Sequence, residues 1–205
     1  LSLHDALPIL MKAEVAGSGA PTILLDPDAP LQTMVGFGAA VTDATAHLIQ
    51  TRMTPSQRDA LLRDLFGREN GGLGFDFTRV TIGASDFSLN HYSLADAEDP
   101  SLAGFSVAPM AAEVFPTVRQ ALAINPELKV MATPWSAPGW MKTTGSMIQG
   151  ELKPEYYSTY ADYLTRYISA AADAGVPTDY ISIQNEPDFE PDSDRKSTRL
   201  NSSHS

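Results

Sequence analysis

The 205-residue chain contains no cysteine, which excludes disulfide bonds, thiolate metal sites and a cysteine nucleophile. It also has no apolar run approaching the roughly 18 residues of a membrane-spanning helix, so no transmembrane segment is expected. Basic side chains are few: 14 Lys and Arg stand against 25 Asp and Glu, for a net charge of −11. This imbalance argues against a nucleic-acid or anionic-membrane binder, because both partners require a positive surface.

Motifs for phosphate, metal and serine chemistry are missing as well. Gly36-Phe37-Gly38 lacks the third glycine of a dinucleotide-binding fingerprint, and there is no GxxxxGK[ST] sequence. The four histidines are scattered and form no HExxH zinc motif. No G-x-S-x-G elbow is present. The sequence therefore predicts neither a metal site nor a cofactor.

The composition is that of a globular protein, with 43% hydrophobic and 19% charged residues. The two ends stand apart from the rest. Residues 1–10 (LSLHDALPIL) and 194–205 (DRKSTRLNSSHS) resemble peptides translated from sequencing-adapter DNA. We interpret both as non-native and omit them from the fold analysis; the alternative is a natural polar terminus. The presence of a signal peptide therefore stays open.

Strand-like and helix-like segments alternate along the remaining chain. Apolar or β-branched runs predict strands at 22–25, 34–41, 75–82, 129–133 and 180–183. Helix signals predict a helix after Thr54, where Pro55 and Gln57 complete a capping box and Gly67 ends the apolar face. Further helices are predicted over 109–124, interrupted at Pro116, and over 154–175.

This β-α-β-α-β-α-β order, counted from residue 34, predicts a parallel sheet covered by helices. Both a doubly wound sheet and part of a (β/α)8 barrel fit, whereas the absence of a fixed-period repeat argues against a solenoid. The last helix carries an apolar and aromatic stripe that we expect to pack against the sheet: Tyr156, Tyr160, Tyr163, Leu164, Tyr167 and Ile168.

Polar and aromatic residues collect directly after the predicted strands, where parallel α/β barrels build their sites. They are Thr42 and Asp43, Ser85 and Asp86, Trp135 followed by Trp140, and Asn185 with Glu186. Structural explanations exist for several of them. Asp43 fits a helix cap, Asp86 fits a turn bond to its own backbone, and Trp135 fits an ordinary core residue.

Glu186 is the hardest of these residues to explain structurally. A carboxylate directly after an apolar strand is expected to be at least half buried, which is unfavourable unless something pairs with it. Such an environment suits a general acid. The adjacent Asn185 offers both a donor and an acceptor to a sugar hydroxyl.

Four stretches resemble glycoside hydrolase family 30, the glucosylceramidase-like group. They are GFGAAVTDATAHLI (36–49), FDFTRVTIGASDFS (75–88), ATPWSAPGWMKTTGSM (132–147) and YISIQNEPDFEP (180–191). The resemblance spans about residues 22–191. Asn-Glu-Pro alone is shared by a wider clan of retaining (β/α)8 glycosidases, whereas the PWSAPGWMK and RVTIGASDFS segments are more specific.

The resemblance implies a (β/α)8 barrel joined to a β-sandwich side domain, to which residues 22–31 would contribute a strand. It implies hydrolysis of a β-glycosidic bond with retention. By this resemblance, Glu186 matches the general acid/base, and Asn185 matches the residue that holds the sugar 2-hydroxyl. Asp86 and Trp135 match residues that bind sugar hydroxyls. Arg79 matches a barrel arginine near the catalytic carboxylates. The implied substrate is a carbohydrate or glycolipid, and secretion or periplasmic residence is expected.

The family nucleophile is a glutamate after the seventh strand, and this sequence reaches only about the fourth βα unit. Asp188, Glu190 and Asp192 do not match that glutamate and are expected to shape the rim. We therefore divide the chain into 1–10 (non-native), 11–33 (lead-in with a possible side-domain strand), 34–193 (first half of the barrel) and 194–205 (non-native). The expected function is a β-glucosidase-like hydrolase that is inactive as this piece alone. The alternative is a sugar-binding or non-functional fragment.

Overall fold

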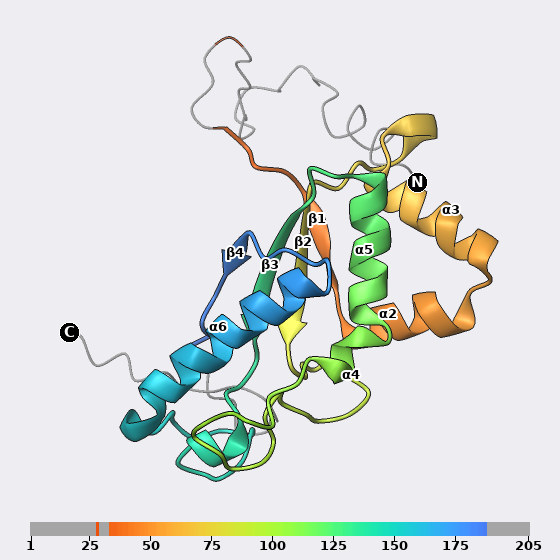
Figure 1. Ribbon diagram of the computed structural model, residues 1–205. Coiled ribbons are helices and arrows are strands. Elements are labelled where there is room, and N and C mark those ends of the chain that lie inside the picture. The colour runs from red at the N-terminus through yellow and green to blue at the C-terminus, as the bar shows by residue number, and fades with distance from the viewer. Residues whose placement is uncertain (1–27, 29–32, 188–205) are drawn as a thin grey trace, which may run out of the picture.

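The computed structural model describes residue 28 and residues 33–187. Its centre is one parallel sheet of β1 (Gly38–Val41), β2 (Phe77–Ile82), β3 (Lys129–Pro134) and β4 (Tyr180–Ile181), in the order β1-β2-β3-β4 (Figure 1). Consecutive strands are neighbours and the order never reverses, as in a (β/α)8 barrel and unlike a doubly wound sheet. The predicted barrel-type fold is thereby confirmed for its first four strands.

Helices fill each connection between the strands. The chain runs from β1 through α2 (Asp43–His47), a π-helical turn (Leu48–Arg52) and α3 (Pro55–Phe66) to β2. It continues through α4 (Ala108–Ala111) and α5 (Val114–Ile124) to β3, and through α6 (Tyr157–Asp173) to β4. Short 3-10 turns lie at Glu69–Gly71, Gly139–Met141 and Pro154–Tyr156. None of the helices in this described part is long and apolar enough to cross a membrane.

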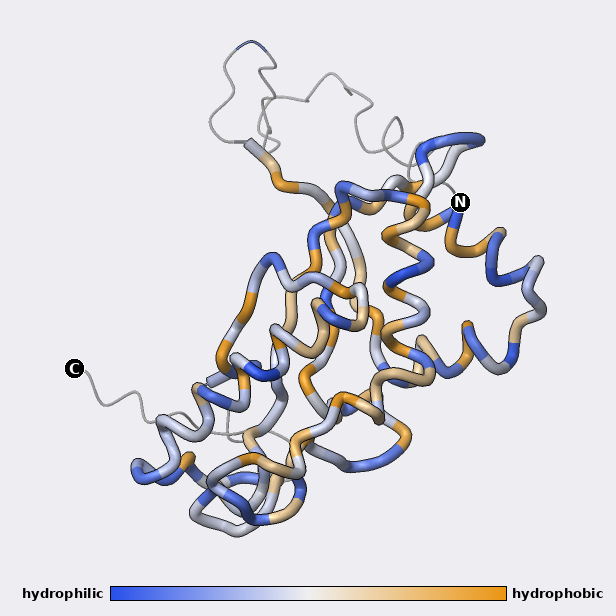
Figure 2. The backbone as a smooth tube through the Cα atoms, viewed as in Figure 1, coloured by the Kyte–Doolittle hydropathy of each residue, from blue (hydrophilic) through white to orange (hydrophobic). Residues whose placement is uncertain are grey.

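Helix α3 begins as its sequence predicts. The Thr54 hydroxyl accepts a hydrogen bond from the Gln57 backbone N–H, and the Gln57 side chain accepts one from the Thr54 N–H, which completes the capping box. The alternation of hydrophobic and hydrophilic residues along α3 is visible in Figure 2. Leu62 and Phe66 are buried against Ala121 of α5, so one face of α3 holds it to the body of the protein.

The predicted break at Pro116 is wrong in position. The chain leaves helical geometry at Glu113, between α4 and α5, whereas Ala112 keeps helical backbone angles. Pro116 is the third residue of α5. The first turn of a helix has backbone N–H groups without intrahelical partners, so a proline there removes no helical hydrogen bond. A proline within an apolar stretch therefore marked the beginning of a helix.

Helices α5 and α6 cover one face of the sheet. Val80 of β2 and Val130 of β3 are fully buried, in one core with Val118 of α5 and Tyr163 and Tyr167 of α6. The predicted aromatic stripe thus packs inward, with Tyr156 partly buried and Tyr160 and Leu164 buried. Ile168 differs, because it is 37% exposed on the outer side of α6.

The opposite face of the sheet is open in the described part of the chain. The rings of Phe77 on β2 and Tyr180 on β4 contact each other there, with centroids 5.6 Å apart. Strand β4 is two residues long rather than the predicted four, and it pairs with β3 alone. Ile181 and Ile183 remain exposed at that edge. Besides β3, the segment is held by the Phe77–Tyr180 contact and by the Tyr160 hydroxyl of α6, which donates to the Ile183 carbonyl at 3.1 Å.

Two glycines meet specific steric requirements. A Cβ atom at Gly38 would come within 1.4 Å of the Phe77 carbonyl oxygen, so the close pairing of β1 with β2 requires glycine. Gly175, predicted to lie just past the last helix, follows the end of α6 with a φ of +77°, in the left-handed region.

The connection from β3 to α6 is organised around a buried lysine. Lys142 is 0% exposed, and its ammonium donates hydrogen bonds to the Met147 carbonyl at 2.8 Å and the Ser136 hydroxyl at 3.2 Å. Burial lowers the pKa of Lys142 to about 7, because the low-dielectric surroundings disfavour the charged form. The Lys142 ammonium, a titratable group, thus joins two parts of the segment that follows Trp135.

We expect Thr54→Ala to lower the free energy of unfolding by about 1 kcal/mol, because it removes the α3 cap. Urea denaturation of the whole protein measures the change. Ser56→Ala, an exposed position in the same turn, is the matched control. Equal stabilities of the two variants would contradict a role for the capping box.

Lys142 should make stability depend on pH. Its pKa is lower in the folded protein, about 7, than in the unfolded chain, about 10.4, so between these values the unfolded state binds more protons. The free energy of unfolding is therefore expected to rise with pH from about 7 towards 10. Urea titrations at several pH values should show this slope in the parent protein and a smaller slope in Lys142→Met. Identical slopes would show that Lys142 keeps its ordinary pKa.

Candidate functional site

The carboxyl ends of the four strands meet at one edge of the sheet, which we call the rim. Val41 of β1 pairs with Val80 of β2, Ile82 of β2 pairs with Pro134 of β3, and Ala132 of β3 pairs with Ile181 of β4. Because the pairing is parallel, the residues after each strand lie at the same edge. The sequence-predicted site residues Asp86, Trp135, Asn185 and Glu186 all belong to this rim.

Arg79 connects three of the strands from the open face of the sheet. Its Nη2 donates to the Asn185 side-chain oxygen at 2.6 Å, and its Nε donates to the Thr133 hydroxyl at 3.3 Å. The guanidinium also stacks on the Trp135 ring, 4.5 Å from the ring centroid. A cation on β2 thus fixes side chains that follow β3 and β4.

The Arg79 contact also orients Asn185. With its amide oxygen facing Arg79, the Asn185 amide nitrogen points to Glu186 and donates to its Oε2 at 3.3 Å. Burial lowers the pKa of Arg79, and the nearby negative charge of Glu186 opposes that shift. Arg79, Asn185 and Glu186 therefore form a connected polar chain across the rim.

The surroundings of Glu186 differ from those that the sequence predicts. Its side chain is exposed, so the prediction that it is at least half buried is wrong for the described structure. The reason is its position after β4, which has a neighbour on one side only. Its φ is +47°, in the left-handed region that costs a non-glycine residue about 1–2 kcal/mol. Backbone strain at this residue makes it a functional candidate independent of burial.

Gln184 is a rim residue that the sequence analysis passed over. It is buried, and its side-chain nitrogen donates to the main-chain oxygens of Trp135 and Asn185, each at 2.9 Å. The Asn185 N–H bonds the Pro134 carbonyl at 2.9 Å. These contacts lock the β3 and β4 rim segments together. The sequence did contain a signal for Gln184, because a polar residue at the end of an apolar strand indicates a rim position.

Asp86 lies outside this network. Its side chain is exposed, and no residue among 33–187 provides a hydrogen bond to its carboxylate. The turn is closed by its neighbours, because the Ser88 hydroxyl accepts from the Ser85 N–H and the Ser85 hydroxyl accepts from the Phe87 N–H. The explanation that Asp86 bonds its own turn is therefore wrong, and its carboxylate is accessible to a ligand.

The other rim residues have structural contacts. Thr42, one residue before Asp43, is the cap of α2 and accepts from the Thr45 N–H, which corrects the assignment of the cap to Asp43. Trp140 donates from its indole nitrogen to the Ala95 carbonyl at 2.8 Å and packs edge-on against Tyr156. Trp135 is only half buried and is not an ordinary core residue.

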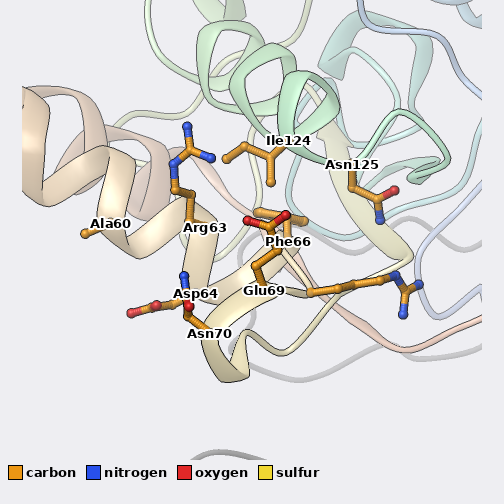
Figure 3. A pocket seen from close by; sticks show the side chains of 10 residues that line it. Ala60, Arg63, Asp64, Phe66, Glu69, Asn70, Ile124 and Asn125 are labelled. Atoms are coloured by element: carbon orange, nitrogen blue, oxygen red, sulfur yellow. The ribbon is translucent and has the colours of Figure 1, made fainter.

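A surface pocket of the described structure lies away from the rim. About 440 Å³ in volume, it lies between the end of α3, the Glu69–Gly71 turn and the end of α5, at the opposite edge of the sheet (Figure 3). Its two arginines are already paired, Arg63 with Asp59 and Arg68 with Asp76. Across the described residues no cluster of three His, Asp or Glu side chains is arranged to hold a metal ion. Asp188, Glu190 and Asp192 lie outside these residues, as do segments 1–10, 194–205 and, apart from Asp28, 22–31.

Comparison with known proteins matches residues 34–203 to the family model "Glycosyl hydrolase family 30 TIM-barrel domain". An endo-1,6-beta-D-glucanase of Neurospora crassa is 35% identical over 191 residues, covering 85% of this chain and 39% of the relative. The lysosomal acid glucosylceramidase of Mus musculus is 32% identical over 185 residues, covering 86% of this chain and 35% of the relative. The chain thus spans less than two fifths of these curated relatives.

Solved structures agree with the sequence matches. The endo-beta1,6-glucanase BT3312 superposes with a TM-score of 0.77 at 36% identity, covering 88% of this chain and 40% of that one. SrfJ from Salmonella typhimurium gives a TM-score of 0.73 at 31% identity, with 78% and 36% covered. Together with the barrel-like strand order and the Asn-Glu pair after β4, these matches lead to one conclusion: the chain belongs to glycosyl hydrolase family 30.

Proposed function

We propose that the protein of which this chain is part is a retaining β-glycoside hydrolase that cuts β-glucosidic bonds. The observation that carries the proposal is the polar chain from Arg79 through Asn185 to Glu186 at the rim. It presents an exposed carboxylate beside an amide of defined orientation. Such an arrangement suits a reaction that moves a proton at a bond held next to a sugar hydroxyl.

Glu186 is proposed as the general acid and base. As an acid it donates a proton to the glycosidic oxygen while the bond to the anomeric carbon breaks. As a carboxylate it then takes a proton from the water that attacks the covalent glycosyl intermediate. Retention needs a second carboxylate about 5–5.5 Å away as the nucleophile. We assign that nucleophile to the part of its relatives' length that this chain does not span.

The neighbouring side chains are proposed to bind the sugar. The Asn185 amide nitrogen, which faces Glu186 in the free site, would contact the 2-hydroxyl. The exposed Asp86 carboxylate would accept hydrogen bonds from further hydroxyls, and Trp135 would bind the same sugar unit. Arg79 acts through Asn185 and Trp135, because its described hydrogen bonds and its stacking are directed at protein groups.

The names of the relatives indicate two substrates to test. Glucosylceramidases occur among them, which supports a glucosylceramide-like glycolipid, and endo-1,6-beta-glucanases also occur, which supports a β-1,6-linked glucan. Both contain a β-glucosidic bond and a neutral sugar, which does not conflict with the acidic composition of this chain. We propose the glucosidic bond as the shared target and comparative hydrolysis of the two substrates as the way to distinguish them.

Glu186→Gln in the whole protein is expected to lower kcat/KM by about 10²–10⁴-fold on glucosides with poor leaving groups, because the proton donor is lost. Aryl glucosides with acidic leaving groups should be much less affected, since they depart without protonation. Glu155→Gln, at an exposed glutamate in the 3-10 turn before α6, is the matched control. If Glu186→Gln retains full turnover on alkyl glucosides, the assignment of Glu186 is wrong.

The 205-residue chain by itself is expected to show no glucosidase turnover and no cooperative thermal transition. In the described residues the outer edges of β1 and β4 are unpaired, and Phe37 and Ile183 are 70% and 59% exposed. Calorimetry and a fluorogenic glucoside assay, run beside the whole protein, test both statements. Sugar binding without turnover by the whole protein would instead favour a carbohydrate-binding function.

A further inference from the structure

Asp43 is a rim carboxylate that the proposed reaction does not use. It is the first residue of α2, directly after β1, and its neighbour Thr42 caps the helix. Its Oδ2 accepts a hydrogen bond at 3.0 Å from the hydroxyl of Tyr92. Tyr92 lies 49 residues further along the chain, in the connection that follows β2.

Asp86 lies on a loop, residues 85–91, whose ends are joined by a hydrogen bond from the Ala84 N–H to the Tyr92 carbonyl at 2.9 Å. Within the loop, Phe87 and Leu89 are 63% and 59% exposed. The loop therefore has little hydrophobic packing of its own to fix the position of Asp86.

Contacts from the β1 end hold this loop from outside. Besides the Tyr92–Asp43 hydrogen bond, the Ala44 N–H donates to the Phe87 carbonyl at 2.8 Å, one residue beyond Asp86. Burial, and after it the negative charge of Asp43, raises the pKa of Tyr92 well above its ordinary value. The phenol thus remains a protonated donor at neutral pH.

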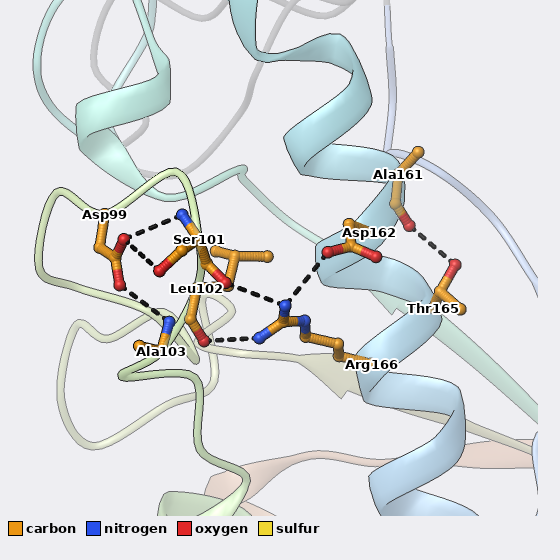
Figure 4. Close-up of polar contacts among 8 residues, drawn as sticks. All are labelled: Asp99, Ser101, Leu102, Ala103, Ala161, Asp162, Thr165 and Arg166. Atoms are coloured by element: carbon orange, nitrogen blue, oxygen red, sulfur yellow. Dashed lines mark hydrogen bonds and ion pairs between the residues drawn. The ribbon is translucent and has the colours of Figure 1, made fainter.

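The more distant part of the same connection is anchored elsewhere. Arg166 of α6 donates to the carbonyls of Leu102 and Ser101, and the Asp99 carboxylate accepts from the Ser101 and Ala103 N–H groups (Figure 4). This anchor begins eight residues beyond the loop, at Asp99. Nearer to the loop, the Leu94 N–H donates to the Tyr163 hydroxyl of α6 at 3.1 Å. The contacts from the start of α2 are those that join the loop itself to the neighbouring β1 end.

We propose that Asp43 is a positioning residue for substrate binding, which acts through Tyr92 to hold the Asp86 loop at the rim. The inference rests on the proposed sugar-binding role of Asp86. The Tyr92–Asp43 hydrogen bond joins two connections that follow different strands. Removal of either partner therefore loosens the same loop, which keeps its backbone bond from Ala44 to Phe87.

The test uses the whole protein and a simple aryl β-glucoside. Tyr92→Phe and Asp43→Ala are each expected to lower kcat/KM by about tenfold, the loss of one hydrogen bond to a charged acceptor, mainly through KM. The double variant should lose no more than either single one. Asp43→Asn should restore most of the activity, because its amide oxygen still accepts from Tyr92. Tyr157→Phe, at an exposed tyrosine of α6, is the matched control.

A second comparison separates positioning from a merely structural role. In an Asp86→Ala background, Tyr92→Phe should cause no further loss of kcat/KM, because the residue through which it acts is gone. An equal tenfold loss in both backgrounds would overturn the inference while leaving the role of Asp86 intact. If Asp86→Ala alone has no effect, the proposed sugar-binding role of Asp86 fails first. If Tyr92→Phe does not fold, Asp43→Ala, which removes the acceptor of the same hydrogen bond, takes its place in both backgrounds.

Discussion

The parallel ladder between β2 and β3 is the interaction on which the rest of the structure depends. It is the most extensive pairing in the sheet, running from Phe77 opposite Lys129 to Ile82 opposite Pro134. Because the two strands run in the same direction, Arg79 in one and Thr133 in the other lie on the same face within hydrogen-bonding distance. The segment after β2 contains Asp86 and the segment after β3 contains Trp135, and both segments lie at the same rim.

A partly buried cation organises the polar groups on that face. Arg79 gives up hydration on burial and regains interactions from an amide oxygen, a hydroxyl and an indole ring. The charge of Glu186 acts favourably on it. In this arrangement the amide of Asn185 has one orientation, and the rim presents its donor towards Glu186. Under the proposed function, this orientation would let Asn185 meet a sugar with little reorganisation, which is a condition for efficient catalysis.

Local signals in the sequence predicted the structure correctly where it depends on residues that are close together in the chain. The capping box at Thr54 and the end of the last helix before Gly175 involve residues within a few positions of each other, and both are confirmed. The tyrosine stripe of α6 follows from helical periodicity. Local reasoning failed at Pro116 and Ile168, because the position of a break and the width of a buried face depend on what packs there.

The sequence by itself determined the alternation of strands and helices, the family resemblance and the set of rim residues, because these follow from short patterns. Only the tertiary structure decided that the strand order is sequential, that Arg79 contacts Asn185 and Trp135, and that Glu186 is exposed with a left-handed backbone. The links through Gln184 and between Asp43 and Tyr92 were likewise invisible beforehand. Each joins residues about 50 positions apart, and such contacts arise only when the parallel strands bring their ends to one edge.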